Sequence, residues 1–251
     1  MSPIRSVRAS VAAAVMLMAA GCGAVDSMTG GSTPSPTPAT NGVADKPPAE
    51  MVALAKRAFE DAEFVRVQGH GDEEGVLYAI DMQIKGGTGP TGGGKGRLTL
   101  NHNSAELLRI GKEAYVKGDA AFWSAATGDL AAAELLKGKY LKGSTDDKRL
   151  KSIVFYTDLQ YFARTMFDLK GTLREAERRT IRGVETIGVE TSGKDAVTLF
   201  IATTGQPRPL QLTSTGTGAG GSILDFLDYD KQFDLKPPPA DLVIDTSKLG
   251  T

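Results

Sequence analysis

The chain has 251 residues, with 29 basic and 30 acidic side chains and a formal net charge of -1. This balance gives no electrostatic case for binding nucleic acid, which requires a concentrated basic surface. The single cysteine cannot form an intrachain disulfide, and the 30 glycines suit a chain built from hairpins and curved sheets.

Residues 1–21 have the pattern of a bacterial secretory signal peptide. Arg5 and Arg8 precede an apolar segment from about Ala9 to Ala20, which is too short for a membrane span of roughly 20 apolar residues. Small residues stand directly before Cys22, and this arrangement resembles a bacterial lipobox. The lipobox usually has leucine three residues before the cysteine, where this chain has alanine. An ordinary signal peptide with an incidental cysteine is the alternative.

The lipobox implies attachment to a membrane. In proteins with this motif the cysteine sulfur receives a diacylglycerol, the signal peptide is cut before it, and the new amino terminus is often acylated. Each buried methylene contributes about 0.8 kcal/mol, so two or three acyl chains hold a protein far more firmly than one. We expect Cys22 to anchor the mature protein on the extracytoplasmic face of the cell membrane. Loss of Arg5 and Arg8 with the signal peptide leaves 27 basic and 30 acidic side chains, a charge of -3.

Residues 22–47 are expected to form a disordered tether between the acylated cysteine and a single domain over 48–251. The segment 30–38, Gly-Gly-Ser-Thr-Pro-Ser-Pro-Thr-Pro, has almost no apolar side chains to offset the entropy lost on ordering. A flexible chain of this length has a root-mean-square span of roughly 25–30 Å. The domain is expected to begin with a helix over 48–62, where apolar residues recur at helical spacing.

Alternating apolar and polar side chains predict antiparallel strands after this helix. The longest such segment is 76–84, in which Val76, Tyr78, Ile80, Met82 and Ile84 would share one face. The same alternation occurs in shorter stretches at 65–68, 98–100, 108–110 and 115–116.

The connection 86–96 is very rich in glycine and contains Gly89-x4-Gly94-Lys95, which resembles the start of a phosphate-binding P-loop. The next residue is Gly96 instead of a magnesium-binding serine or threonine, and a strand follows where a helix is needed. We therefore interpret 86–96 as a flexible hairpin loop.

The middle of the chain changes to helical periodicity. Residues 119–141 are expected to be helical, with a break near Gly128 and an end at Gly138. A stronger pattern over 157–170 predicts a second helical segment.

This second helix has apolar residues at the i, i+3, i+4, i+7 and i+8 positions, counted from Leu159. Thr157 and Gln160 are expected to form a capping box at its start, and Gly171 is expected to end it.

Strands are expected again in the last third of the chain, at 173–181, 184–191, 197–201, 210–212 and 223–229, before a tail that turns back through 242–244. The segment order is a helix, about five strands, helices and about five more strands. This order predicts an α+β protein with an antiparallel sheet of about ten or eleven strands.

A sheet bent around helices can fill its concave face with side chains or leave an apolar cavity. Both outcomes remain open from the pattern, although amphipathic helices on sheets usually just pack. The side chains that would line a cavity come from one strand and from the two helical segments: Val76, Tyr78, Ile80, Met82, Phe122, Trp123, Leu135, Leu136, Leu159, Phe162, Met166 and Phe167.

The sequence contains no catalytic or metal-binding constellation that we can name. The two histidines, His70 and His102, do not stand in a metal-ligand spacing, and no Gly-x-Ser-x-Gly nucleophile motif occurs. We therefore expect a protein that is not an enzyme and carries no cofactor and no metal.

The layout and several short phrases resemble actinobacterial lipoproteins of the LppX/LprAFG type, which in turn look like the LolA/LolB carriers. The resemblance covers roughly 48–245, and the phrases lie at 114–123, 136–140, 204–210 and 223–229. It implies a half-barrel sheet with helices over its concave side and an apolar cavity that holds acyl chains. The 86–96 loop and the charged strand 174–182 depart from the family.

Three functions follow as hypotheses. The first is a membrane-anchored lipoprotein that binds or transfers lipid or glycolipid acyl chains. The second is a non-enzymatic envelope lipoprotein with a filled core that acts as a scaffold, sensor or protein-binding module. The third is an envelope hydrolase, for which no nucleophile can be named. A membrane-protein partner that loads the cavity would fit the carrier role, without a motif of its own in the sequence.

Overall fold

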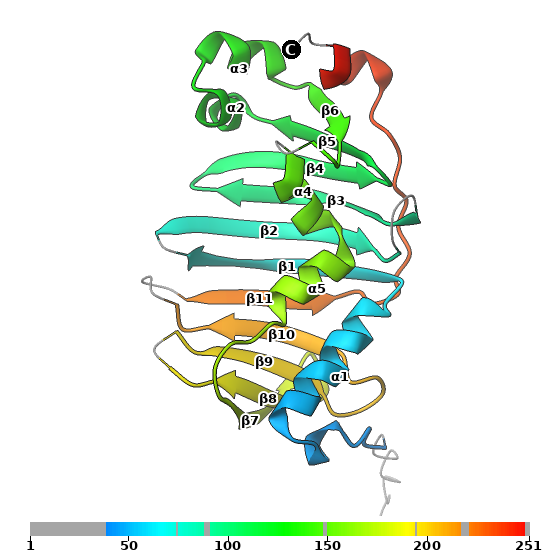
Figure 1. The fold of residues 1–251 in the computed structure, drawn as a ribbon, viewed down its shortest axis with the longest axis vertical. Coiled ribbons are helices and arrows are strands. Elements are labelled where there is room, and N and C mark those ends of the chain that lie inside the picture. The colour runs from blue at the N-terminus through cyan, green and yellow to red at the C-terminus, as the bar shows by residue number, and fades with distance from the viewer. Residues whose placement is uncertain are drawn as a thin grey trace, which may run out of the picture. The chain divides into compact units, whose positions relative to one another are not determined.

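An open sheet forms the framework of the protein, and helices lie across one of its faces (Figure 1). In this computed structural model the described residues are 39–73, 75–87, 91–147, 150–193, 195–216 and 221–248. The helical elements are η1 (Val43–Asp45), α1 (Pro48–Glu60), α2 (Ala120–Thr127), α3 (Leu130–Leu136), α4 (Lys151–Thr157), α5 (Leu159–Met166), η4 (Ala240–Leu242) and η5 (Thr246–Lys248). The strands are β1 (Phe64–Glu73), β2 (Val76–Lys85), β3 (Gly93–Leu100), β4 (Asn103–Ile110), β5 (Glu113–Gly118), β6 (Tyr140–Ser144), β7 (Leu173–Ile181), β8 (Val184–Thr191), β9 (Val197–Ala202), β10 (Pro209–Ser214), β11 (Ser222–Leu227) and β12 (Val243–Asp245).

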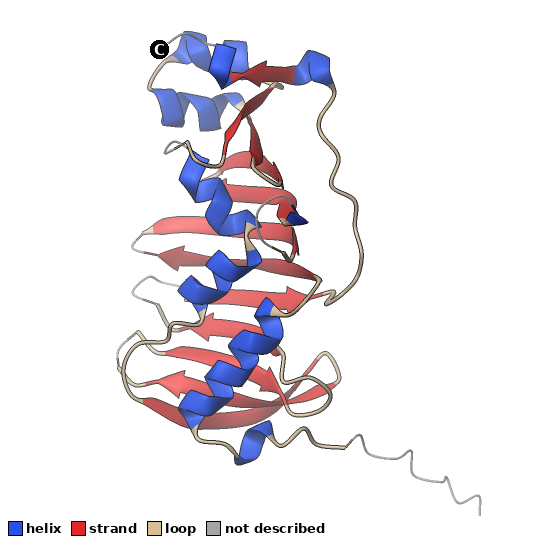
Figure 2. Cartoon of the chain, turned by 45° about the vertical axis from the view of Figure 1, so that its right-hand side comes forward, coloured by secondary structure: helices blue, strands red, loops and turns tan. Residues whose placement is uncertain are grey.

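The strands form one 12-stranded sheet in the order β12-β6-β5-β4-β3-β2-β1-β11-β10-β9-β8-β7. Strands that follow each other in the sequence pair antiparallel within β1–β6 and within β7–β11. β1 joins these two halves by pairing antiparallel with β11, and β12 pairs parallel with β6. Figure 2 shows α1, α4 and α5 together on one side of the sheet. The predicted α+β architecture, an unclosed sheet with helices packed over its inner face, is confirmed.

The core lies between these helices and the inward side chains of the strands. In β2, Ile80, Met82 and Ile84 are buried, as period-two alternation predicts for a half-buried strand. The first predicted helix is also confirmed, because α1 starts at Pro48, where proline costs nothing, and buries Phe59 completely.

The start of β3 corrects the predicted loop 86–96. Gly93, Gly94 and Gly96 belong to this strand and pair with both β2 and β4. A Cβ at Gly94 would lie 3.1 Å from the Thr157 Cα atom, so glycine at this position lets the α4–α5 junction approach the sheet closely. Gly94 therefore allows close packing of the helical junction on the inner face of β3.

The predicted helix over 157–170 is wrong at both ends. Residues 151–157 form a separate helix, α4, and Asp158 has an extended backbone between α4 and α5. The Asp158 carboxylate accepts a hydrogen bond from the Tyr161 amide at 2.9 Å, so Asp158 caps α5 in place of the predicted Thr157 box. The helix ends at Met166, and Gly171 lies in the loop that follows.

Two short strands, β6 and β12, explain why the sheet has more than the predicted ten or eleven strands. Tyr140 and Leu141, placed in the helical segment by the sequence pattern, lie in β6. The tail turns back as expected, and Val243 and Ile244 of β12 pair with these same two residues.

The domain begins earlier than the sequence boundary at residue 48. Thr40 bridges Thr204, the Asn41 side chain donates to the Ala202 carbonyl at 2.9 Å, and Val43 is buried in the core. Residues from Pro38 onward form one compact unit that contains the whole described core, so we expect it to fold on its own. The predicted signal peptide, Cys22 and the rest of the tether lie outside the described residues. No helix of the described part is long and apolar enough to span a bilayer.

Candidate functional site: an apolar cavity under α5

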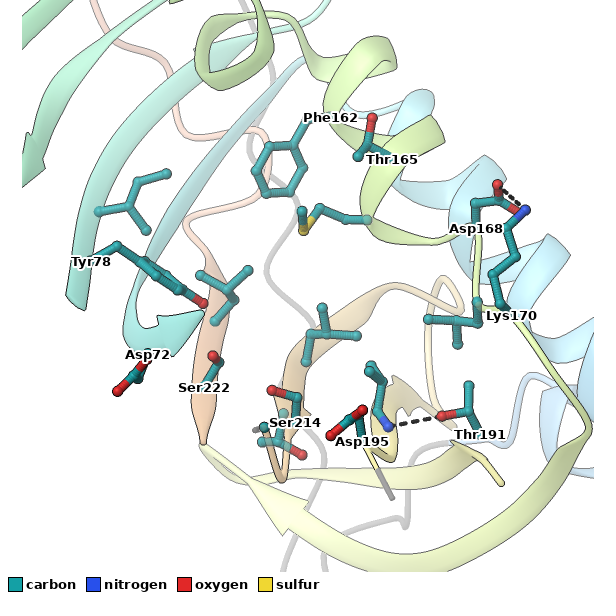
Figure 3. A pocket seen from close by; sticks show the side chains of 18 of the residues that line it. Asp72, Tyr78, Phe162, Thr165, Asp168, Lys170, Thr191, Asp195, Ser214 and Ser222 are labelled. Atoms are coloured by element: carbon teal, nitrogen blue, oxygen red, sulfur yellow. Dashed lines mark hydrogen bonds and ion pairs between the residues drawn. The ribbon is translucent and has the colours of Figure 1, made fainter. Parts of the chain in front are cut away.

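A cavity of about 550 Å³ opens between α5, the segment after it, and the inner face of the sheet (Figure 3). Its volume falls within the roughly 300–1,000 Å³ of typical small-molecule sites. The helical wall consists of Phe155, Tyr156, Phe162 and Met166, and Leu169 extends it from the loop after α5. The sheet wall consists of Tyr78, Ile80, Val197, Leu212 and Leu224.

The spacing of apolar residues in α5 produces this wall. Leu159, Phe162 and Ala163 lie on one face and are buried, and this face holds the helix against the core. Met166 and Thr165, one turn further on, border the cavity.

Packed aromatic rings close the cavity on the core side. Phe162 stacks on Phe155 with 5.4 Å between ring centroids and lies 6.0 Å from the Phe59 ring. Phe226 in turn meets Phe59 edge-on at 5.3 Å. Such contacts fix ring positions beyond simple area burial, so this end of the cavity is a rigid floor.

Gly69 and Gly71, on the inward face of β1, leave space that side chains of the neighbouring strands occupy. A Cβ at Gly69 would collide with the Ile223 backbone and the Leu224 side chain. A Cβ at Gly71 would collide with the side chains of Ser222 and Tyr78. Neighbouring strands therefore supply the side chains that line the cavity at this position.

A buried arginine fixes the junction between α4 and α5 above the sheet. Arg109 of β4 points inward, and its Nη2 donates to the Thr157 carbonyl at 2.7 Å and to the Asp158 carboxylate at 3.3 Å. Its Nε also donates to the Thr157 hydroxyl at 3.2 Å, and Nη1 donates to the Gly111 carbonyl at 3.1 Å. Burial lowers the pKa of Arg109, and the charge of Asp158 acts in the opposite direction. Arginine stays protonated in proteins, so this is a charged clamp that holds the helical wall in place.

The mouth of the cavity is polar. Asp168 and Asp195 contribute two carboxylates, and Lys170 contributes the single ammonium group among the lining residues. Asp72 borders the mouth at the end of β1, where its carboxylate accepts a hydrogen bond from the Gly75 amide at 2.8 Å. Figure 3 places Asp72 beside Ser222, Asp195 near Ser214, and the Asp168–Lys170 pair on the opposite rim.

The structure brings together Tyr78, Ile80, Phe162 and Met166 from the predicted cavity set. Met82, Leu159 and Phe167 are buried in the core, and Val76 is 41% exposed at the start of β2. The remaining four lie in α2 and α3, at the other end of the sheet: Phe122, Trp123, Leu135 and Leu136. Leu135 is 76% exposed. Cys22 lies outside the described residues.

Sequence reasoning missed six residues of the two walls: Phe155, Tyr156, Leu169, Val197, Leu212 and Leu224. Alternation in β9, β10 and β11 places Val197, Leu212 and Leu224 on the inner face. No sequence signal shows that the space above these three strands stays open.

A larger hollow of about 940 Å³ lies on the outer face of the sheet, and its chemistry differs. Its lining is mostly charged and internally paired, with 2.6 Å between Arg66 and Asp81 and 3.6 Å between Arg97 and Glu106. Such a surface does not suit an acyl chain. Among the described residues, no group of three or more histidine, cysteine, aspartate or glutamate side chains is placed to hold a metal ion.

No protein-family model and no curated protein matches this sequence. Among solved structures, LprF from Mycobacterium bovis superposes with a TM-score of 0.51 at 12% identity, over 76% of this chain and 96% of LprF. The chain has the fold of LprF. The Mycobacterium tuberculosis lipoprotein LppX matches with a TM-score of 0.48 at 13% identity, over 75% of this chain and 98% of LppX. The LprF fold confirms the predicted resemblance at the level of architecture, and the cavity under α5 lies between the helices and the sheet of this fold.

Proposed function

We propose that this chain is a membrane-anchored extracytoplasmic lipoprotein that binds or transfers lipid or glycolipid acyl chains in the cavity under α5. The observation that carries the proposal is an apolar, open volume of about 550 Å³ between α5 and the sheet. The signal-peptide pattern and Cys22 support the anchoring part.

The free energy of moving an acyl chain from a bilayer to the cavity is compatible with a lipid carrier. An acyl chain exposed to water costs about 0.8 kcal/mol per methylene, or roughly 12 kcal/mol for a sixteen-carbon chain. Moving the chain from the bilayer into the cavity exchanges one apolar environment for another, so the net change is small and the transfer is reversible. Binding of this kind requires no covalent chemistry, and we assign no catalytic residue.

Lipid binding can be tested on residues 38–251 purified from an actinobacterial host and weighed by native mass spectrometry before and after organic extraction. We expect an adduct of lipid mass that is lost on extraction and regained after incubation with phospholipid or glycolipid vesicles. Leu169→Asp places a carboxylate on the cavity wall and should remove most of this adduct. Leu169 lies in the loop after α5 and is only partly buried, so the variant should still fold.

The matched control is Leu135→Asp, the same change at a leucine of α3 that is 76% exposed. The control should keep the adduct. If the wild-type protein takes up no added lipid, or if both variants bind it equally, the cavity is not a lipid site and the filled-core binding module becomes the better account.

A further inference from the structure

We propose that the protein docks on the surface of a lipid bilayer through the edge of the sheet at which the cavity opens. Two apolar turns lie at this edge, the β1–β2 turn with Val76 and Leu77 and the α2–α3 turn with Leu130. The inference rests on the proposed function, because the docked bilayer is the source or the acceptor of the acyl chain.

The directions of the strands place the cavity mouth and both turns at one edge, which we call the mouth edge. β1, β8 and β10 end there, and β2, β9 and β11 begin there. The lining residues Tyr78, Ser214 and Ser222 lie at these strand ends. β5 also ends at the mouth edge, beside the start of β4, and α2 follows β5 almost directly, so the α2–α3 hairpin lies at the same edge (Figure 1).

Exposed apolar side chains are concentrated at these two turns. Among the described residues, five large apolar side chains are exposed, and three of them are at the turns: Leu130 is 75% exposed, Leu77 49% and Val76 41%. Three alanines next to the α2–α3 turn are exposed as well: Ala125, Ala126 and Ala131. Single exposed apolar residues are ordinary on a protein surface, but a group beside the opening of an apolar cavity is typical of an interaction site.

Helix geometry separates Leu130 from Leu135, which is 76% exposed. An α-helix turns by about 100° per residue, so Leu135, five residues later, lies roughly 140° around α3 from Leu130. The two side chains therefore cannot both lie against one flat surface. Leu130 directly follows the turn at Gly128 and Asp129, whereas Leu135 is near the end of the helix that returns to β6. We assign Leu130 and not Leu135 to the docking surface.

The proposed anchor at Cys22 allows this orientation. Thr40, near the start of the described chain, bridges Thr204, which follows the end of β9 at the opposite edge of the sheet. The 17 residues 22–38 can span at most about 60 Å. A ten-residue strand such as β1 crosses only about 33 Å of sheet. A chain acylated at Cys22 can therefore place its mouth edge on the bilayer that holds its anchor.

Apolar burial, and not charge, drives the docking. The charged residues of the two turns are acidic. Asp72 accepts a hydrogen bond from the Gly75 amide at 2.8 Å, and Asp129 caps α3 by accepting one from the Ala131 amide at 2.8 Å. Acidic side chains do not attract anionic headgroups, so we expect binding to a zwitterionic bilayer that neither anionic lipid nor low salt strengthens.

The test is co-flotation of residues 38–251 with phosphatidylcholine vesicles on a density gradient, with the bound fraction measured against lipid concentration. Burying a leucine completely shifts an equilibrium by about tenfold to a hundredfold. The variant Leu77→Ser/Leu130→Ser should therefore bind the vesicles at least about tenfold more weakly than wild type. Both side chains are exposed, so the variant should keep the wild-type urea midpoint. Adding phosphatidylglycerol to the vesicles should leave wild-type binding unchanged.

The matched control is Leu135→Ser, the same change in the same helix at a leucine of almost equal exposure, and it should keep wild-type vesicle binding. No vesicle binding by wild type, equal weakening by both variants, or binding that requires phosphatidylglycerol would overturn the docking surface. A wild-type dimer that Leu77→Ser/Leu130→Ser converts to a monomer in sedimentation would also overturn it, because a second copy would then cover the mouth edge. A lipid adduct retained in any of these cases leaves the proposed function intact, whereas vesicle binding without a lipid adduct would overturn the proposed function alone.

Discussion

Replacing Arg109 with methionine should destabilise the protein strongly, because this side chain connects the inner face of β4 to the junction of α4 and α5. The Arg109 side chain is only 4% exposed, and its guanidinium makes hydrogen bonds to Thr157, Asp158 and Gly111. Methionine fills a similar volume but supplies no donor.

The size of the destabilisation follows from the buried polar groups that would lose their hydrogen-bond donor. The Thr157 and Gly111 carbonyls would lose donors in a region that water does not reach, at about 1–3 kcal/mol each. Asp158 would lose its only cationic partner among the described residues, and removing one member of a buried ion pair typically costs about 3–5 kcal/mol. These effects overlap, so we expect a loss of about 3–5 kcal/mol in the free energy of unfolding.

Urea unfolding can be followed through the single tryptophan, Trp123. With an m-value of about 3 kcal/mol/M, the midpoint for Arg109→Met should fall by roughly 1–1.7 M. The control is Arg97→Met, which removes an exposed arginine that lies 3.6 Å from Glu106 and should cost less than about 1 kcal/mol. Equal midpoint shifts for the two variants would refute the view that Arg109 clamps the helical wall.

Three further predictions concern other parts of the chain. Gly94→Val should lower the free energy of unfolding by about 1–3 kcal/mol in the same urea assay, because its branched side chain would push against Thr157; an unchanged midpoint would contradict the close approach. Cys22→Ser should abolish incorporation of labelled palmitate into the full chain in cells, and undiminished labelling would show that Cys22 is not the acylation site. Burial and a hydrogen bond to Glu106 raise the pKa of Tyr140 to about 12, so its contribution to stability is present below the unfolded value of about 10 and is lost as the pH rises towards 12. Tyr140→Phe should therefore lose less stability than wild type between pH 9 and pH 11.5, and identical urea midpoint shifts in the two proteins would contradict this assignment.

Periodicity predicted the fold where a segment buries one face against the rest of the protein. The alternation in β2 located Ile80, Met82 and Ile84 on the inner face, and the helical spacing from Leu159 located α5. The start of α5 could not be predicted in the same way. Thr157 and Asp158 are both good capping residues. Arg109, 48 residues earlier in the chain, donates a hydrogen bond to the Thr157 hydroxyl, and Asp158 caps the helix.

The candidate site was harder to predict than the fold, because an apolar pattern shows that a side chain avoids water but not which space it borders. Phe122 and Trp123 pack against each other with 5.1 Å between ring centroids at the far end of the sheet, and Leu135 points away from the core. The cavity depends instead on side chains that are missing, at Gly69 and Gly71, and on the loop that carries Leu169 past the end of α5.

The most direct test of the central claim is photo-cross-linking with a lipid that carries a diazirine in one acyl chain, followed by mass spectrometry of the labelled peptides of residues 38–251. The proposed function predicts labels on the cavity walls, in the peptides that contain Phe162, Leu169, Leu212 and Leu224, and loss of these labels when an unlabelled lipid competes. Labels confined to α2–α3 or to the outer face of the sheet, or no label at all, would contradict the claim that the space under α5 holds an acyl chain.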